Sequence, residues 1–168
     1  MGRVIFWTAV TALFTALLEA AVISNIPFLP VMPDLVMLVI VYVSFVNSSS
    51  VGSTTGFISG LILDFLSASP IGLNAFTKTV TGYVAGKFSG SFNLDRVVIP
   101  ALMGLAATVL KALVTLVLSL FFGPSIIAYR IAGSALWLEI VANVVCAPIV
   151  FAILSQFPPL FARRGSPE

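Results

Sequence analysis

The chain has 168 residues, of which 60% are hydrophobic and only 8% are charged, and its formal net charge is +2. Soluble domains contain about 45–50% apolar and about 25% charged residues, so these few charges could not cover the surface of a water-soluble domain of this size. The small net charge gives no indication of nucleic-acid binding. The composition therefore predicts an integral membrane protein surrounded by lipid.

The apolar residues occur in long runs without the polar–apolar alternation of a transmembrane strand. Such runs are typical of membrane-spanning helices. We therefore expect an all-α integral membrane protein, a bundle of six transmembrane helices that forms a single domain over residues 1–168. The expected spans are, in chain order, Val4–Ile26, Leu35–Val46, Val51–Leu66, Leu73–Phe88, Val97–Phe122 and Gly133–Phe157.

The first span has two interpretations, because Arg3 precedes its apolar stretch as in a secretory signal peptide. The stretch continues to Ile26, beyond the about 7–15 residues of a signal-peptide core, and it contains Glu19. We therefore expect a retained helix. One side of this helix carries polar residues at helical spacing, and the threonine hydroxyls either pack across helices or bond to carbonyls of their own helix. These residues are Thr8, Thr11, Thr15 and Glu19.

The break at Asn47–Ser50 decides the number of spans, because Leu35–Leu66 could also be one broken helix in a five-span protein. Lys and Arg concentrate in cytoplasmic loops. Six spans with a cytoplasmic N-terminus place nearly all basic loop residues inside, whereas five spans divide them between the two sides. Six spans with both termini cytoplasmic are therefore expected. The inside residues are then Arg3, Lys87, Arg96, Arg163 and Arg164, and the outside residue is Arg130.

Five ionisable residues fall within the expected spans, and each costs at least about 2.5 kcal/mol at a bilayer centre unless it is partnered. Their charges sum to −1, so nearly complete pairing is possible. Four of them lie in the outer half of the membrane, and Lys111 lies near the middle of its span. Such a polar cluster either holds a helix bundle together or lines a substrate cavity that opens outward. The five residues are Glu19, Asp64, Lys78, Lys111 and Glu139.

Glycines recur every four residues in the third and fourth spans, a spacing that lets two membrane helices approach closely. The pattern predicts a tight antiparallel hairpin in which the two glycine ladders meet. Each ladder leads to a charge, Asp64 in one and Lys78 in the other, and we expect these two charges to lie within reach of each other. Pro70 and Gly72 restrict the turn between the helices. The ladders are Gly52, Gly56, Gly60 and Gly82, Gly86, Gly90.

Catalytic and metal-binding chemistry has little support in the sequence. Cys146 is the single cysteine and there is no histidine, so neither an intrachain disulfide nor a Cys/His metal site is possible. No residue pair has the nucleophile-and-base pattern of acyl or phosphoryl transfer. We expect a protein that is not an enzyme and has no cofactor.

One segment resembles a known family. Residues 56–72 read GFISGLILDFLSASPIG, preceded by Pro33-Asp34-Leu35 and followed by GYVAGK at residues 82–87. This combination resembles the bacterial rod shape-determining protein MreD family. The motif covers roughly residues 33–87, while length and hydropathy match over the whole chain. The turn at Asn47–Ser50 departs from the family, in which it is often basic.

The resemblance implies a non-enzymatic scaffold subunit of the cell-elongation machinery in the bacterial cytoplasmic membrane. It implies association with MreC, and with the MreB filament and the peptidoglycan polymerase and transpeptidase pair. It also implies a helix bundle similar to the substrate-binding subunits of energy-coupling-factor vitamin transporters. Two other functions remain open, a small-molecule-binding subunit of such a transporter and an ion pathway through Lys111 and the acidic residues.

Overall fold

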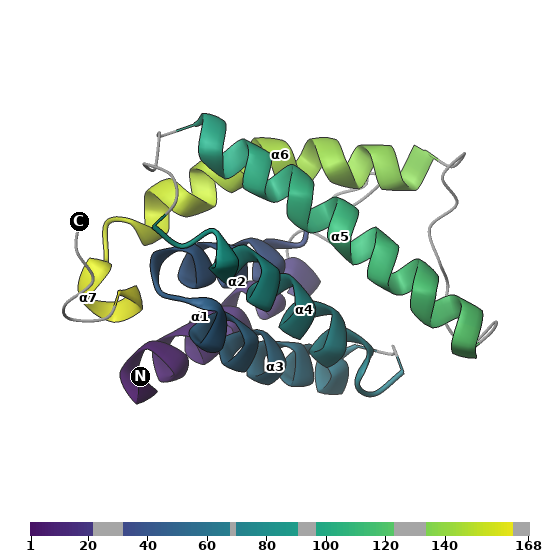
Figure 1. Cartoon of the computed structure of the whole chain (residues 1–168), viewed down its shortest axis with the longest axis horizontal. Helices are drawn as coiled ribbons and strands as arrows, with labels where there is room; N and C mark the ends of the chain where they lie inside the picture. The colour runs from purple at the N-terminus through teal and green to yellow at the C-terminus, as the bar shows by residue number, and fades with distance from the viewer. Residues whose placement is uncertain (22–31, 68–69, 91–96, 123–133, 163–168) are drawn as a thin grey trace.

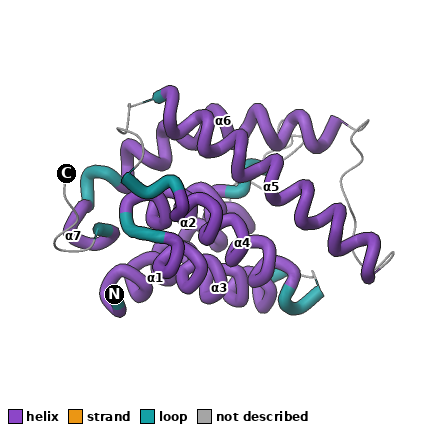
Figure 2. Tube along the Cα trace, viewed as in Figure 1, coloured by secondary structure: helices purple, strands orange, loops and turns teal. Residues whose placement is uncertain are grey.

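The computed structural model describes residues 1–21, 32–67, 70–90, 97–122 and 134–162, and within these ranges every regular element is helical (Figure 2). The helices end within a few residues of the predicted boundaries, and the short α7 is an addition. Residues 22–26 and 133, which belong to two predicted spans, lie outside the described ranges. The helices are α1 (Gly2–Ala21), α2 (Leu35–Val46), α3 (Ser49–Leu66), α4 (Leu73–Lys87), α5 (Val98–Phe122), α6 (Ser134–Leu154) and α7 (Pro158–Phe161).

Three of these helices, α1, α5 and α6, are long and apolar enough to cross a membrane. The predicted class of an all-helical membrane protein is therefore confirmed for the described part of the chain. Helix α2 is more apolar than these three but has only 12 residues. The six crossings and their orientation stay predictions, and four of the basic residues used for the orientation, Arg96, Arg130, Arg163 and Arg164, lie outside the described residues.

Helix α2 forms the centre of the bundle, and all of its residues from Val36 to Phe45 are buried. Helices α5 and α6 pack on one side of it, and α1 and α3 pack on the other (Figure 1). A helix that is apolar on every side is stable only where protein or lipid surrounds it completely. The uniformly apolar sequence of α2 is compatible with its central position, where protein surrounds it.

The break between α2 and α3 is a turn that reverses the chain. Ser44 of α2 lies beside Gly52 of α3, and Val36 shares an apolar cluster with Leu63, so the two helices run antiparallel. The Asn47 amide at the turn donates hydrogen bonds to the carbonyls of Val43 at 2.8 Å and of Phe161 in α7 at 2.7 Å. One broken helix over Leu35–Leu66 is therefore excluded.

Helices α3 and α4 form the predicted tight antiparallel hairpin, with the most extensive contact of any two helices. At Gly52 and Gly82 each backbone lies against the other, so that a Cβ atom at either position would overlap the opposite carbonyl. Gly56 lies against the Lys78 backbone in the same way, and Gly60 lies against that of Ala75.

The register of the two glycine ladders differs from the prediction beyond this first pair. In an antiparallel pair, four residues up one helix correspond to four residues down the other, so the glycines beyond Gly52 and Gly82 face backbone of non-glycine residues. Gly86 thus packs against Ser48 and Ser49. Gly90 follows the end of α4 with a φ of +73° and is open on its Cβ side, so it belongs to a turn and was wrongly assigned to the ladder.

Candidate functional site

The carboxylate of Asp34, at the residue that precedes α2, binds two ammonium groups. Its Oδ1 accepts a hydrogen bond from the Met37 backbone N–H at 2.9 Å, which caps the helix. Its two oxygens lie 3.0 and 2.8 Å from Nζ of Lys78 in α4, and Oδ2 lies 2.9 Å from Nζ of Lys111 in α5. Asp34 therefore connects α2 to two other helices.

Lys111 extends this arrangement to α6, because its Nζ also lies 2.7 Å from Oε1 of Glu139. The side chains of Lys78 and Glu139 are only 2% and 4% exposed. A buried charge is tolerated only when partners replace its water shell. We call Asp34, Lys78, Lys111 and Glu139 the ionic cluster.

Glu19 of α1 lies at the edge of the ionic cluster and binds backbone. Its Oε1 accepts hydrogen bonds from the backbone N–H groups of Leu35 and, at 3.3 Å, Val36. The first N–H groups of a helix have no partner within the helix, and the helix dipole favours a negative charge beside them. Glu19 thus attaches α1 to the beginning of α2.

Asn143 of α6 adds a polar contact that the sequence analysis missed. Its Oδ1 accepts the backbone N–H of Asp34 at 2.8 Å, and its Nδ2 donates to Oγ1 of Thr108 in α5 at 3.0 Å. The residue is completely buried. A single asparagine in an apolar run, one helical turn after Glu139, was the signal that could have identified it.

Asp64 lies apart from the ionic cluster and caps α4. Its carboxylate accepts the backbone N–H groups of Gly72 at 2.9 Å, Asn74 at 2.9 Å and Ala75 at 3.1 Å. The predicted ion pair with Lys78 is therefore wrong. The unpaired N–H groups at the start of α4 take the Asp64 carboxylate, and Lys78, farther along the helix, reaches Asp34 instead.

The turn that carries this cap has the residues that its geometry requires. Gly72 has a φ of +97°, a conformation that side chains other than glycine rarely adopt. The carbonyl of Pro70 accepts the Leu73 backbone N–H at 3.1 Å. The Asp64, Pro70 and Gly72 elements of the sequence motif thus fix the start of α4.

Other predicted polar residues serve their own segments. The hydroxyls of Thr8, Thr11 and Thr15 donate to the backbone carbonyls of Val4, Trp7 and Thr11 at 2.7–2.9 Å, so the threonines bond to their own helix. Pro33, which precedes Asp34 in the sequence motif, is buried. Of the five predicted intramembrane charges, Lys78, Lys111 and Glu139 meet in the ionic cluster, Glu19 borders it and Asp64 lies apart.

The arrangement holds helices together. Each charge of the ionic cluster has an opposite charge as its partner, and the cluster with Glu19 and Asn143 links α1, α2, α4, α5 and α6. The described residues contain no group of three or more His, Cys, Asp or Glu that could hold a metal ion. The geometry indicates a fixed polar connection between helices.

The fold and this connection define a class, the all-helical membrane proteins whose helices are joined through buried ion pairs. The chain belongs to the rod shape-determining protein MreD family, which it matches over residues 1–157. No curated protein and no solved structure matches it. The chain is thus a membrane protein of a shape-determining family that is not known as a family of enzymes.

Proposed function

We propose that the chain is a non-enzymatic scaffold subunit of the cell-elongation complex in the bacterial cytoplasmic membrane. In this role it binds MreC, and through MreC it associates with the MreB filament and with the peptidoglycan polymerase and transpeptidase pair. The complex supports peptidoglycan synthesis and maintains the rod shape of the cell. The observation that carries the proposal is the family match over residues 1–157. The ionic cluster supports it, because a bundle whose charges pair internally presents lipid and partners with a stable set of helix faces.

We further propose that the chain crosses the membrane six times as one domain with both termini cytoplasmic, in a bundle similar to the substrate-binding subunits of energy-coupling-factor transporters. The direction of the helices supports this topology. One apolar cluster includes Val4 and Val51 from the first turns of α1 and α3, and Val43, Ala85 and Leu154 from the last turns of α2, α4 and α6. Helix α5 runs antiparallel to α6, because Gly104 lies against Ala147 while Lys111 pairs with Glu139. Successive helices therefore alternate in direction, as six consecutive crossings require.

The short helices are compatible with this topology. A spanning helix in lipid needs about 20 residues, and α2 has 12. Non-helical backbone at membrane depth is tolerated where protein surrounds it. The residues before α2 meet this condition, because Pro33 is buried and the N–H groups of Asp34 and Leu35 bind Asn143 and Glu19.

The family match does not support the vitamin-binding alternative. The polar residues that suggested a substrate cavity bind one another or, for Glu19 and Asp64, bind backbone N–H groups. The exposed surfaces of α1 and α5 are instead apolar, with Phe14 and Phe121 61% and 80% exposed. Such surfaces fit lipid and the apolar helices of membrane partners.

Co-purification tests the scaffold function. The chain and MreC, expressed together and extracted in a mild detergent, are expected to elute as one complex of fixed stoichiometry. Conservative apolar changes on the face that MreC contacts should remove the complex without lowering the amount of the chain in the membrane. If MreC is absent from the purified protein under mild conditions, the scaffold proposal is wrong.

Cysteine labelling tests the topology in a background in which Cys146 is replaced by serine. Single cysteines at Ser50 and Ser155, both exposed, are expected to react with a membrane-impermeant maleimide only from the cytoplasmic side. A cysteine at the exposed Ser67 should react only from the outer side. Labelling of position 155 from outside would exclude six spans with both termini cytoplasmic.

A further inference from the structure

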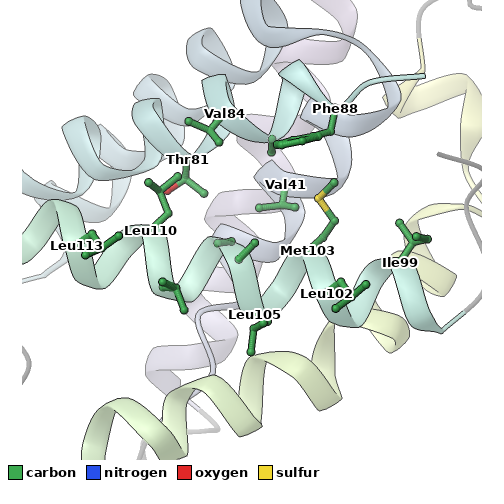
Figure 3. Close-up of a pocket in the computed structure, with 14 residues that line it drawn as sticks. Val41, Thr81, Val84, Phe88, Ile99, Leu102, Met103, Leu105, Leu110 and Leu113 are labelled. Atoms are coloured by element: carbon green, nitrogen blue, oxygen red, sulfur yellow. The ribbon is translucent and has the colours of Figure 1, made fainter. Parts of the chain in front are cut away.

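An apolar groove lies between α4 and α5, with Val41 of α2 at its floor (Figure 3). The cavity has a volume of about 590 Å³. Thr81 is the polar residue of its lining, and its hydroxyl donates to the Thr77 carbonyl at 2.9 Å. The groove therefore offers an occupant no free hydrogen-bond donor from a side chain, which suits a hydrocarbon chain.

The groove is long enough for the acyl chain of a lipid in one membrane leaflet. Its wall on α5 runs from Ile99 to Leu113. These 15 residues of helix correspond to about 21 Å at about 1.5 Å per residue, more than half of the about 30 Å hydrocarbon core of a bilayer. Helix α5 is also one of the three helices that are long and apolar enough to span the membrane. With α5 as a spanning helix, a groove along it would follow the depth of the hydrocarbon core.

A cation is next in sequence to one end of the groove lining. Phe88 is the last lining residue on the α4 side, and the residue before it, Lys87, ends α4 with an exposed side chain. The Lys87 ammonium lies 5.1 Å from the centroid of the Tyr83 ring and, among the described residues, makes no ion pair. Lysine and tyrosine at a helix end are typical of the headgroup level of a membrane.

We propose that this groove binds an acyl chain of an anionic phospholipid whose phosphate pairs with Lys87. The inference goes beyond the scaffold function and rests on two separate features, an apolar groove of acyl-chain dimensions and an exposed lysine, next in sequence to the last lining residue of α4, whose charge is complementary to the headgroup. A bound lipid would fill the gap between α4 and α5, whose mutual contact is sparse compared with the glycine-packed contact of α3 and α4.

Native mass spectrometry of the detergent-purified chain tests the proposal. The protein is incubated with equal amounts of phosphatidylglycerol and phosphatidylcholine that carry the same acyl chains, and the retained lipids are counted. We expect about fivefold preference for phosphatidylglycerol, because one cationic side chain near an anionic membrane surface contributes about 1 kcal/mol. Lys87→Gln should remove this preference, whereas Arg3→Gln, on a helix that does not line the groove, should keep it.

A second variant tests the groove independently of charge. Ala106 lines the groove and is exposed, so Ala106→Phe should fill it without disturbing the buried packing, and thermal unfolding checks that it does. Retention of both lipids should fall, whereas Ala152→Phe, at an exposed position of α6, should leave it unchanged. Equal retention of the two lipids by the unmodified chain would overturn the proposal. Unchanged lipid retention in Ala106→Phe would also overturn it. If that variant instead loses MreC while its lipid retention is unchanged, the groove holds a protein helix and the lipid proposal is wrong.

Discussion

The two ends of the helix bundle are stabilised by different interactions. At one end the ionic cluster joins helices through ion pairs of 2.7–2.9 Å. At the other end Tyr42 packs edge-on against Phe151 and Phe161, with ring centroids 5.2 and 6.4 Å apart, within an apolar cluster. Both ends join the same central helix, α2, to its neighbours.

The difference shows what can specify helix packing within lipid. Apolar burial gives little net gain there, because lipid tails surround an apolar side chain as favourably as protein does. A charge without its partner, in contrast, is expensive in hydrocarbon. We therefore expect the polar end to determine which helices meet, and the apolar end to contribute packing that tolerates substitution.

The largest effect is expected from Gly56→Leu, which acts on the hairpin that connects the two ends. A Cβ atom at position 56 would overlap the Lys78 carbonyl, so the backbones of α3 and α4 must separate. The variant should fail to accumulate as a folded protein, measured by size-exclusion chromatography of the detergent extract. Phe57→Leu, at an exposed neighbouring position, is the matched control, and normal elution of Gly56→Leu would contradict the close packing.

Asp34→Ala should have the next largest effect, because it leaves Lys78 and Lys111 without their shared carboxylate. Removing one partner of a buried ion pair costs about 3–5 kcal/mol in water-soluble proteins. We expect a loss of this order in thermal or denaturant unfolding in detergent. Asp34→Asn keeps an oxygen that can cap α2 and should lose less. A stability of Asp34→Ala equal to that of the unmodified chain would show that the polar end does not hold the bundle.

Phe151→Ala examines the apolar end and should have a smaller effect. The ring is 1% exposed, and in a water-soluble core its removal would cost about 3–5 kcal/mol. Lipid replaces water as the alternative environment of the ring here, so the loss should fall below this range and below that of Asp34→Ala in the same unfolding experiment. A larger loss of stability in Phe151→Ala than in Asp34→Ala would show that the apolar end contributes more to holding the bundle than the polar end does.

The smallest expected quantity is the coupling between Asp64 and Lys78. The two side chains have different partners, so the free-energy changes of Asp64→Ala and Lys78→Ala should add within about 0.5 kcal/mol. The corresponding cycle for Asp34 and Lys78, which are 2.8 Å apart, should show clear coupling. Strong coupling between Asp64 and Lys78 would support the ion pair that the sequence pattern predicted.

Several features of the fold are predictable from local pattern. The lengths of the apolar runs give the helices, and the turn at Asn47–Ser50 follows from a cluster of polar residues. The four-residue glycine spacing predicts the α3–α4 hairpin, because the close packing involves only two helices that are adjacent in the chain. The Asp64, Pro70 and Gly72 elements also act within one hairpin, although their role as a cap for α4 was not recognised.

The partners of the charges were not predictable in the same way. Asp34 lies in sequence outside the expected spans, so it was considered only as part of the family motif before the second span. Asn143 carries no charge that would draw attention to it. Helix α7 was missed because its four residues have no periodicity of their own, and they fold back through the Asn47 and Tyr42 contacts.

The sequence by itself determined that this protein lies in a membrane and where most of its helices begin and end, because composition and local spacing decide these properties. Its membership of a shape-determining family rests on the match over residues 1–157. Only the tertiary structure decided that Lys78 and Lys111 share Asp34, that Asp64 caps α4, and that the glycine ladders meet at Gly52 and Gly82. Those choices depend on which helices lie side by side and on their relative register. Residues as far apart in the chain as Asp34 and Lys111 meet only through the packing of α2 against α5.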